Sequence, residues 1–356
     1  MITGNKGEWS ELYVLLYLLG TGKLYAANKE SKKLKNEYFP IIKIMRESLN
    51  NQKVDYLLKN ESEVEIFIND TFSARLPSNL FKHEADYLYD QIIKGTNRAF
   101  SIAKTEEFMK RISTDRLAAP SSDKTDITMK VRDIRVGYEQ IMGFSIKSEL
   151  GNAPTLLNAS GATNFSYEIL GISDSDMEQI NSIETKTKIL DRISCIYNKG
   201  GNIKYSHAVN GVFSENLMLI DSNMENIIAE LLLYSYTKNV TSCANLISDI
   251  ADLNPLKFPR KDFYSYKFKK LLCAIALGMK PSTVWDGIDE ANGGYIVVTT
   301  DGNILAYHIY NRNYFEQYLL DNTRLERAST SRHGYASIYK DKNKYYMNLN
   351  LQIRFI

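Results

Sequence analysis

The chain has 356 residues, of which 44% are hydrophobic and 24% charged, so its composition excludes a disordered scaffold and predicts a sizeable core. Its net charge of +2 excludes a positive field over the whole protein, so any DNA-binding surface has to be local. The three widely spaced cysteines, Cys195, Cys243 and Cys273, indicate reduced thiols in a cytoplasmic protein and argue against structural zinc.

The first predicted element is a helix over residues 7–20, with an apolar face and a glycine stop. Its apolar stretch is too short to cross a bilayer and follows acids, so neither a signal peptide nor a membrane anchor is expected. Glu8 and Glu11 lie three residues apart, on one face of this helix. They are candidate metal ligands, although an acidic first turn also compensates the helix dipole.

Residues 23–115 are expected to form an inserted α+β subdomain, which either shapes a DNA groove or braces the core. The apolar patterns predict strands over 24–27, 38–45, 54–58 and 64–69, a helix over 78–94, a strand near 100–103 and a helix over 105–111.

The next two strands carry the strongest chemical signal. Residues 126–132 and residues 144–147 alternate apolar with polar side chains, and the link between them is short enough to fold back. This predicts a hairpin whose polar face carries Asp126, Ser145 and Lys147. A solvated face without chemistry is the alternative, because the same short pattern recurs elsewhere in the chain.

Such a face matches the needs of phosphodiester hydrolysis. The reaction requires a divalent cation to polarise the phosphate and acidify a water, and a cationic group to orient the nucleophile. Mg²⁺ prefers oxygen ligands, which Asp126 and the backbone carbonyl of Ile146 can supply, while Lys147 provides the positive charge. Ser145 stands where many such enzymes have a second acid. Another carboxylate must therefore come from elsewhere in the chain.

The segment after Lys147 is rich in short hydrogen-bond donors. A loop over residues 148–158 leads back into regular structure, and donors of this kind position phosphates without reading sequence, although they are common in any loop. The candidate phosphate contacts are Ser148, Thr155, Asn158, Ser160 and Asn164.

The middle of the chain is predicted to be mainly helical, over residues 176–197, 221–238, 240–252 and 262–278, with strands over 203–207 and 212–220. The stretch 257–270 is the densest basic segment and is interleaved with aromatic residues. Lys261 and Lys267 in it are candidates for contacts to the DNA backbone. The alternative is a helix with core aromatics and solvated lysines.

The C-terminal part is predicted to consist of hairpin strands over residues 295–300, 304–309, 335–340 and 345–355, with a helix over 314–320. Between the hairpins lies a polar loop over residues 322–334. Arginine recognises guanine in the major groove, so this loop is the candidate for base readout at a G·C site. Its candidate contacts are Arg324, Arg327, Ser329, Thr330, Ser331, Arg332 and His333. The alternative is a surface loop whose arginines pair with Glu326 and Asp321.

Four sequence blocks in order, over residues 4–11, 143–148, 154–165 and 350–355, make the chain resemble the HpaII family of Type II restriction endonucleases from residue 4 to residue 355. The resemblance implies the PD-(D/E)XK nuclease superfamily and a Mg²⁺-dependent double-strand break that leaves 5′-phosphate ends, at CCGG if the specificity is shared. It also implies double-stranded DNA as the partner, a homodimer on the palindrome, and a companion methyltransferase that protects the same site.

By the same resemblance, Asp126 matches the metal-binding acid and Lys147 the catalytic lysine, whereas Ser145 departs from the usual acid. Some restriction enzymes with serine there use a glutamate from the following helix, which nominates Glu168 or, less plausibly, Glu149. The start of the first helix resembles that of archaeal Holliday-junction resolvases, where the residue matching Glu11 binds metal. The expected order for the third acid is Glu11, then Glu8, then Glu168.

The expected fold is α+β, with an α/β nuclease core built as a mixed sheet flanked by helices. The expected segments are a core helix (1–22), the inserted subdomain (23–115), the catalytic core (116–220), a helical lobe (221–290) and C-terminal hairpins (291–356). A non-catalytic DNA-binding module on a nuclease fold, and a junction-resolving or repair nuclease, are the alternative functions.

Overall fold

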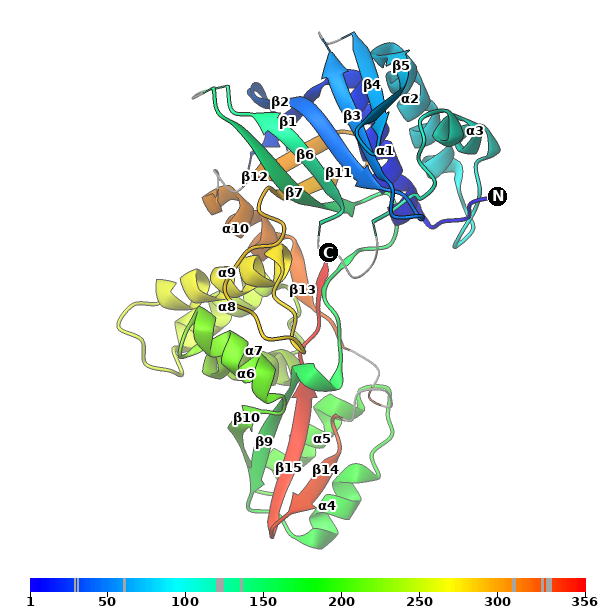
Figure 1. The fold of residues 1–356 in the computed structure, drawn as a ribbon. Helices are drawn as coiled ribbons and strands as arrows, with labels where there is room; N and C mark the ends of the chain where they lie inside the picture. Colours follow the sequence, from blue (N-terminus) through cyan, green and yellow to red (C-terminus); the bar gives the residue numbers. More distant parts are fainter. Residues whose placement is uncertain are drawn as a thin grey trace. The chain divides into compact units, whose positions relative to one another are not determined.

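The structure is a computed structural model that describes residues 1–28, 30, 32–59, 62–119, 125–134, 137–308, 312–327, 330 and 335–356. It combines helices with β-sheets, which confirms the expected α+β class. The chain divides into two compact units (Figure 1). Unit 1 comprises Met1–Pro154 and Asp289–Phe315, and unit 2 comprises Thr155–Ile288 and Glu316–Ile356.

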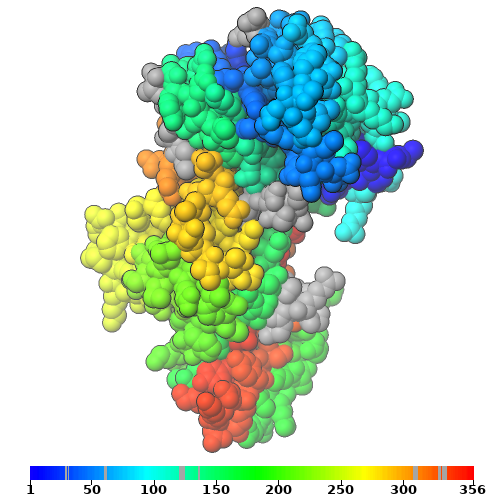
Figure 2. Space-filling model, viewed as in Figure 1, coloured from blue at the N-terminus to red at the C-terminus, as the bar shows by residue number. Residues whose placement is uncertain are grey.

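Unit 1 is built on a mixed sheet in which nine strands of the described chain take part. Their bounds are β1 (Lys23–Ala27), β2 (Lys33–Glu47), β3 (Lys53–Lys59), β4 (Glu63–Ile68), β5 (Thr71–Pro77), β6 (Ile127–Arg132), β7 (Glu139–Ser148), β11 (Gly294–Val298) and β12 (Ile304–His308). The order across the sheet is β1-β12-β11-β7-β6-β2-β3-β4-β5. The segment from β3 to β5, in blue, forms much of the surface of this unit that is visible in Figure 2.

The long strand β2 joins the two parts of this sheet. Its first half pairs with β1, while Ile44 in its second half lies opposite Tyr56 of β3 and Met129 of β6. All three of these side chains are fully buried in one hydrophobic cluster. Residues 23–115 therefore extend the sheet that contains the β6–β7 hairpin and share its core.

Three helices of unit 1 are α1 (Lys6–Thr21), α2 (Ser78–Lys94) and α3 (Ala103–Arg111). Asn5 caps α1 by accepting hydrogen bonds from two backbone amides, and α1 ends at Gly22, whose φ of 67° is the left-handed conformation that favours glycine. A Cβ atom on Gly20 would lie 2.6 Å from the backbone nitrogen of Lys82. Glycine at this position thus lets α1 pack closely against α2.

Unit 2 contains two smaller sheets, with strand orders β10-β9-β15-β14 and β13-β16-β8. The strands are β8 (Thr155–Leu157), β9 (Asn164–Leu170), β10 (Asn202–Ala208), β13 (Thr323–Leu325), β14 (Ile338–Asp341), β15 (Lys344–Asn350) and β16 (Ile353–Phe355). The helices are α4 (Asp174–Asn181), α5 (Lys188–Asn198), α6 (Gly211–Ile220), α7 (Met224–Lys238), α8 (Cys243–Leu253) and α9 (Asp262–Leu277), with a 3₁₀ turn at Gly161–Thr163. The helix α10 (Arg312–Asp321) crosses the boundary between the units.

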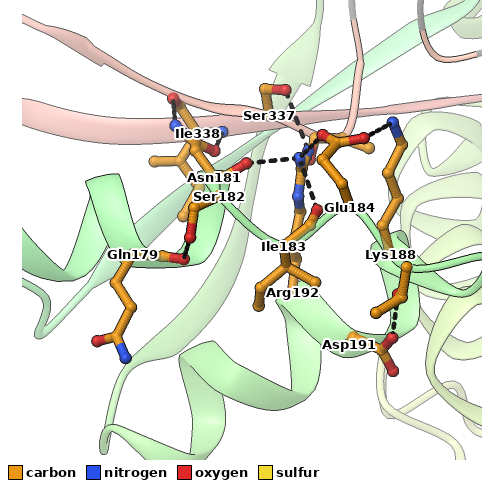
Figure 3. Close-up of polar contacts among 12 residues, drawn as sticks. Gln179, Asn181, Ser182, Ile183, Glu184, Lys188, Asp191, Arg192, Ser337 and Ile338 are labelled. Atoms are coloured by element: carbon orange, nitrogen blue, oxygen red, sulfur yellow. Dashed lines mark hydrogen bonds and ion pairs between the residues drawn. The ribbon is translucent and has the colours of Figure 1, made fainter.

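A buried arginine on α5 joins this helix to α4 and to the segment just before β14 in unit 2 (Figure 3). Arg192 is 2% exposed, and it donates hydrogen bonds to the carbonyl oxygens of Ala336 and Asn181 and to the carboxylate of Glu184. The side chain of Asn181 in turn exchanges hydrogen bonds with the backbone of Ile338, at 2.8 Å each. Because its charge is paired with Glu184 and both terminal nitrogens of its guanidinium donate hydrogen bonds within the unit, Arg192 has a structural role.

Several predictions from the sequence are corrected here. Residues 212–220 were expected to be a strand but belong to the helix α6, whose N-cap Asn210 accepts a hydrogen bond from Phe213 N. The expected strand near 100–103 is only an isolated bridge between Phe100 and Gly4. The strand β5 was not predicted. In the described part of the chain, no helix is both long enough and apolar enough to span a membrane.

Candidate active site

The hairpin of β6 and β7 forms as the sequence predicts. Asp126 lies immediately before β6, and its backbone N–H donates to the carbonyl oxygen of Phe144 across the hairpin. One carboxylate oxygen, Oδ2, accepts hydrogen bonds from Ser145 Oγ at 3.0 Å and from the backbone N–H of Ile146 at 2.6 Å. Oδ1 receives no hydrogen bond from a described residue. The hairpin thus fixes the Asp126 carboxylate through one oxygen and leaves the other available to a ligand.

Lys147 lies on β7 beside the parallel strand β11, where Val297 is its partner in the register. Its Nζ is 5.3 Å from the centre of the Tyr295 ring. Burial lowers the pKa of Lys147, while the nearby carboxylates of Asp126 and Glu11 act in the opposite direction. The charges of both acids therefore act on the ammonium group of Lys147.

Glu11 reaches this site from α1. Its Oε2 accepts a hydrogen bond of 3.0 Å from the backbone N–H of Ala119. Burial, followed by the charge of Asp126, raises the pKa of Glu11 to about 8, and Arg46 and Lys147 oppose this rise. The structure thus brings Glu11, Asp126 and Lys147 into one electrostatically connected site, although they are far apart in the sequence.

The other candidate acids have different environments. Glu8 accepts a hydrogen bond of 2.7 Å from the backbone N–H of Asn5, so it completes the cap of α1. Glu168 was expected on a helix following the lysine, but it lies on the strand β9 in unit 2 and pairs with Lys344 at 2.9 Å. Glu149 accepts a hydrogen bond from the backbone of Thr300.

A cleft of about 270 Å³ opens beside Asp126 in unit 1. The residues that line it are Met45, Arg46, Glu47, Arg116, Ala119, Thr125, Asp126, Ile127 and Thr128. The sequence reasoning did not identify the two arginines, because neither belongs to a recognisable motif. The only available signal was their position: Arg46 is the last residue but one of the long strand β2, and Arg116 follows α3 shortly before the hairpin.

The donor set at Asp126 and Glu11 fits a hard divalent cation. Carboxylate and carbonyl oxygens are the ligands that such ions prefer, and two neighbouring carboxylates repel each other until a cation offsets their charge. Within the described residues there is no cluster of three His, Cys, Asp or Glu side chains that could hold a metal. A cation here would thus complete its shell with the carbonyl of Ile146, water or substrate.

The expected phosphate contacts after Lys147 include residues whose polar groups are already used. The hydroxyl of Ser148 is buried and bonded to Ser10 Oγ at 2.8 Å. Asn164 is 4% exposed, and its side-chain oxygen accepts a hydrogen bond from Asn350. These two residues therefore stabilise the fold. Thr155, Asn158 and Ser160 belong to unit 2, and of the three only Asn158 is exposed.

The basic candidates in unit 2 mostly have partners within the protein. Lys267 pairs with Asp221, and its Nζ lies 5.6 Å from the centre of the Phe258 ring. Lys261 pairs with Asp252 at 2.9 Å on the surface. This favours the alternative in which the basic strip is a helix with core aromatics.

The structure describes only part of the candidate readout loop. Arg324 pairs with Glu326 at 2.9 Å, and Arg327 donates to the side chain of Asn239 at 2.8 Å. Thr330 is half-buried. The remaining candidates, Ser329, Ser331, Arg332 and His333, lie outside the described residues.

Comparison with known proteins identifies the family. The model of the HpaII restriction endonuclease family matches residues 5–355. The chain belongs to this family. It is 39% identical over 358 residues to the Type II restriction enzyme HpaII of Haemophilus parainfluenzae, and the match covers 99% of each chain. No solved structure matches the chain.

Family membership confirms the resemblance found in the sequence. The chain is an HpaII-like Type II restriction endonuclease, a site-specific deoxyribonuclease that acts on double-stranded DNA. This decides against the non-catalytic DNA-binding module. Restriction endonucleases generally use a divalent metal ion, which agrees with the oxygen ligands at Asp126 and Glu11.

Proposed function

We propose that this enzyme hydrolyses both strands of DNA at the palindrome CCGG, in a Mg²⁺-dependent reaction that leaves 5′-phosphate ends. The active site is that of a PD-(D/E)XK nuclease with Asp126, Glu11 and Lys147 as its catalytic residues. The observation that carries the proposal is the electrostatic connection of these three side chains, in which both acids act on Lys147 and Asp126 acts on Glu11. The recognition site rests on similarity to the HpaII enzyme alone.

In this proposal Asp126, Glu11 and the backbone carbonyl of Ile146 would hold Mg²⁺. When bound, the ion polarises the phosphate and acidifies a water molecule. Ser145 is a positioning residue, because its hydroxyl and the N–H of Ile146 fix Oδ2 of Asp126 and direct the other oxygen toward a ligand. Ser145 thus orients Asp126 from the position where related enzymes have a second acid. Glu11 supplies the negative charge that this second acid would provide.

Lys147 orients the attacking water and offsets the negative charge that develops on the phosphate. Burial lowers the pKa of its ammonium group, so its proton is held less strongly than that of an exposed lysine. The carboxylates of Asp126 and Glu11 act in the opposite direction and favour the charged form that this role requires.

One active site faces one strand, so a palindromic site is cut by a two-fold homodimer, each protomer cutting one strand. A companion DNA methyltransferase that modifies the same sequence would protect the host. We propose the cytoplasm as the site of action, where the three cysteines stay reduced.

The test is a plasmid digest with Mg²⁺ on methylated and unmethylated DNA, with the ends sequenced. We expect fragments from unmethylated CCGG sites, each with a 5′-phosphate. Lys147→Ala and Asp126→Ala should each lower the cleavage rate by about 10³-fold or more while DNA binding stays detectable. Cleavage by either variant at the wild-type rate would show that the site is assigned to the wrong residues.

A further inference from the structure

Two arginines in the cleft beside Asp126 are held in place by the protein backbone. Arg46 Nη2 donates to the carbonyl oxygens of Arg116 and Leu117, at 3.3 Å each. Arg116 Nη2 donates to the carbonyl of Ser48, next to the end of β2. These contacts join β2 to the segment after α3. They use one nitrogen of each guanidinium, and no described residue accepts a hydrogen bond from the others.

Neither guanidinium has a carboxylate within 4 Å among the described residues. This distinguishes the pair from other arginines of the protein, since Arg132 pairs with Glu139 at 2.5 Å and Arg75 pairs with Glu65 at the same distance. Burial lowers the pKa of the half-buried Arg46, while the charges of Glu11 and Asp115 act in the opposite direction without pairing with it directly. Arginines away from bulk water are rarely left without a counter-charge, so an anion is expected beside them.

The anion must be one that tolerates the acids of the same cleft. Asp126 and the exposed Glu47 also line it, and Glu11 acts on Arg46 from α1. A free small anion would be repelled by these groups, whereas a phosphate tethered in a DNA strand is delivered to the cleft by the rest of the duplex. The planar guanidinium group binds phosphate oxygens through two parallel hydrogen bonds.

We propose that Arg46 and Arg116 bind a backbone phosphate of the DNA adjacent to the scissile one, and so position the strand at Asp126. This rests on the proposed function, because it places the cut strand at Asp126. It assigns a DNA-binding role to the region of residues 23–115, which provides Arg46 on β2.

The test measures binding of a short CCGG duplex with Mg²⁺, in a Lys147→Ala background in which the DNA stays intact. Arg116→Gln should weaken binding about tenfold and should lower the slope of log affinity against log salt by about one. Arg75→Gln, an arginine on β5 that already pairs with Glu65, is the matched control and should change neither quantity. Arg46→Lys keeps the charge but not the paired donors. Its affinity for the duplex should therefore lie between those of wild type and Arg46→Gln. Thermal unfolding of each variant checks that it is folded. If Arg46→Gln does not fold, the proposal is tested with Arg116→Gln alone.

A phosphate scan then identifies the contact. Each phosphate of the duplex is replaced in turn by an uncharged methylphosphonate. At one position next to the cut, the replacement should weaken DNA binding by the Arg75→Gln control about tenfold. The same replacement should not change DNA binding by Arg116→Gln. If every position weakens both proteins equally, the arginines bind no phosphate. Cleavage by Asp126→Ala is measured separately, so an error in the catalytic assignment would be recognised independently of this result.

Discussion

The charged side chains around Asp126 in unit 1 differ from those of the basic strip and the readout loop in unit 2. In unit 1, Lys147 and Arg46 lie near Asp126 without a carboxylate within 4 Å among the described residues, and Glu11 is held near its neutral form by burial. In unit 2, the comparable basic residues are paired, as Lys267 is with Asp221 and Arg324 with Glu326. Charges paired within the chain stabilise a fold, whereas unpaired charges beside a carboxylate mark a place for ligands. Charge density alone, which favoured the basic strip of unit 2 in the sequence, does not distinguish these cases.

The largest stability effect expected from this comparison is at Glu11. Its pKa in the folded protein, about 8, lies above the ordinary value of 4.5, so its contribution to stability is full below pH 4.5 and is lost as the pH rises to 8. Without metal, Glu11→Gln should therefore be more stable than wild type by about 2 to 4 kcal/mol above pH 8, and nearly equal to it below pH 4.5. Denaturant unfolding at a series of pH values measures this difference.

Glu8→Gln is the control, because Glu8 completes the cap of α1 through the backbone N–H of Asn5. It should not reproduce the gain in stability over wild type that Glu11→Gln shows above pH 8. A Glu11→Gln protein whose stability relative to wild type is the same at all pH values would mean that the pKa of Glu11 is not raised in the folded protein.

An intermediate effect is expected at the arginines of β13 and the loop after it. If Arg324 and Arg327 read guanine, replacing either with alanine should reduce discrimination at one G·C position by about 1 to 3 kcal/mol. Competition binding with duplexes that differ at single base pairs measures the loss. Equal weakening on all sequences would make them backbone contacts, and no weakening would leave Glu326 and Asn239 as their only partners.

The smallest effect is expected in the basic strip. Lys267→Ala should cost about 1 kcal/mol of stability, since it leaves the partly buried Asp221 without its partner. It should not change the salt dependence of DNA binding, because Lys267 is turned toward Asp221 and Phe258. Lys261→Ala, in an exposed pair, serves as the comparison and should change stability by less. A smaller salt dependence of DNA binding for Lys267→Ala would contradict this and indicate that the basic strip contacts DNA.

The parts of the fold that the sequence predicted are those with a strong local pattern. The helix α2 has the predicted bounds, Ser78–Lys94, and the alternation in β6 and β7 was sufficient to predict the hairpin. The helix α6 was mistaken for a strand because its apolar residues are dense enough to hide the helical period, although Asn210 was available as a capping signal. In β9 the alternation of Phe165, Tyr167 and Ile169 could have indicated a strand.

The site was predictable only in part, for a physical reason. Asp126, Ser145 and Lys147 come from one hairpin, so spacing along two strands brings them together. Glu11 was chosen by resemblance, and its closeness to Asp126 depends on the packing of α1 against the sheet. Arg46 and Arg116 could not be found, because their significance lies in having no carboxylate within 4 Å among the described residues, which is a property of the folded chain alone.

The central claim is that Glu11 completes the metal site with Asp126. The most direct test is a Mg²⁺ titration of single-turnover plasmid cleavage by Glu11→Gln, Glu8→Gln and Glu168→Gln. We predict that Glu11→Gln requires about tenfold more Mg²⁺ or more for half-maximal cleavage, since it loses one charged ligand, while the other two variants titrate as wild type does. A shift in Glu8→Gln or Glu168→Gln, with Glu11→Gln unchanged, would contradict the claim.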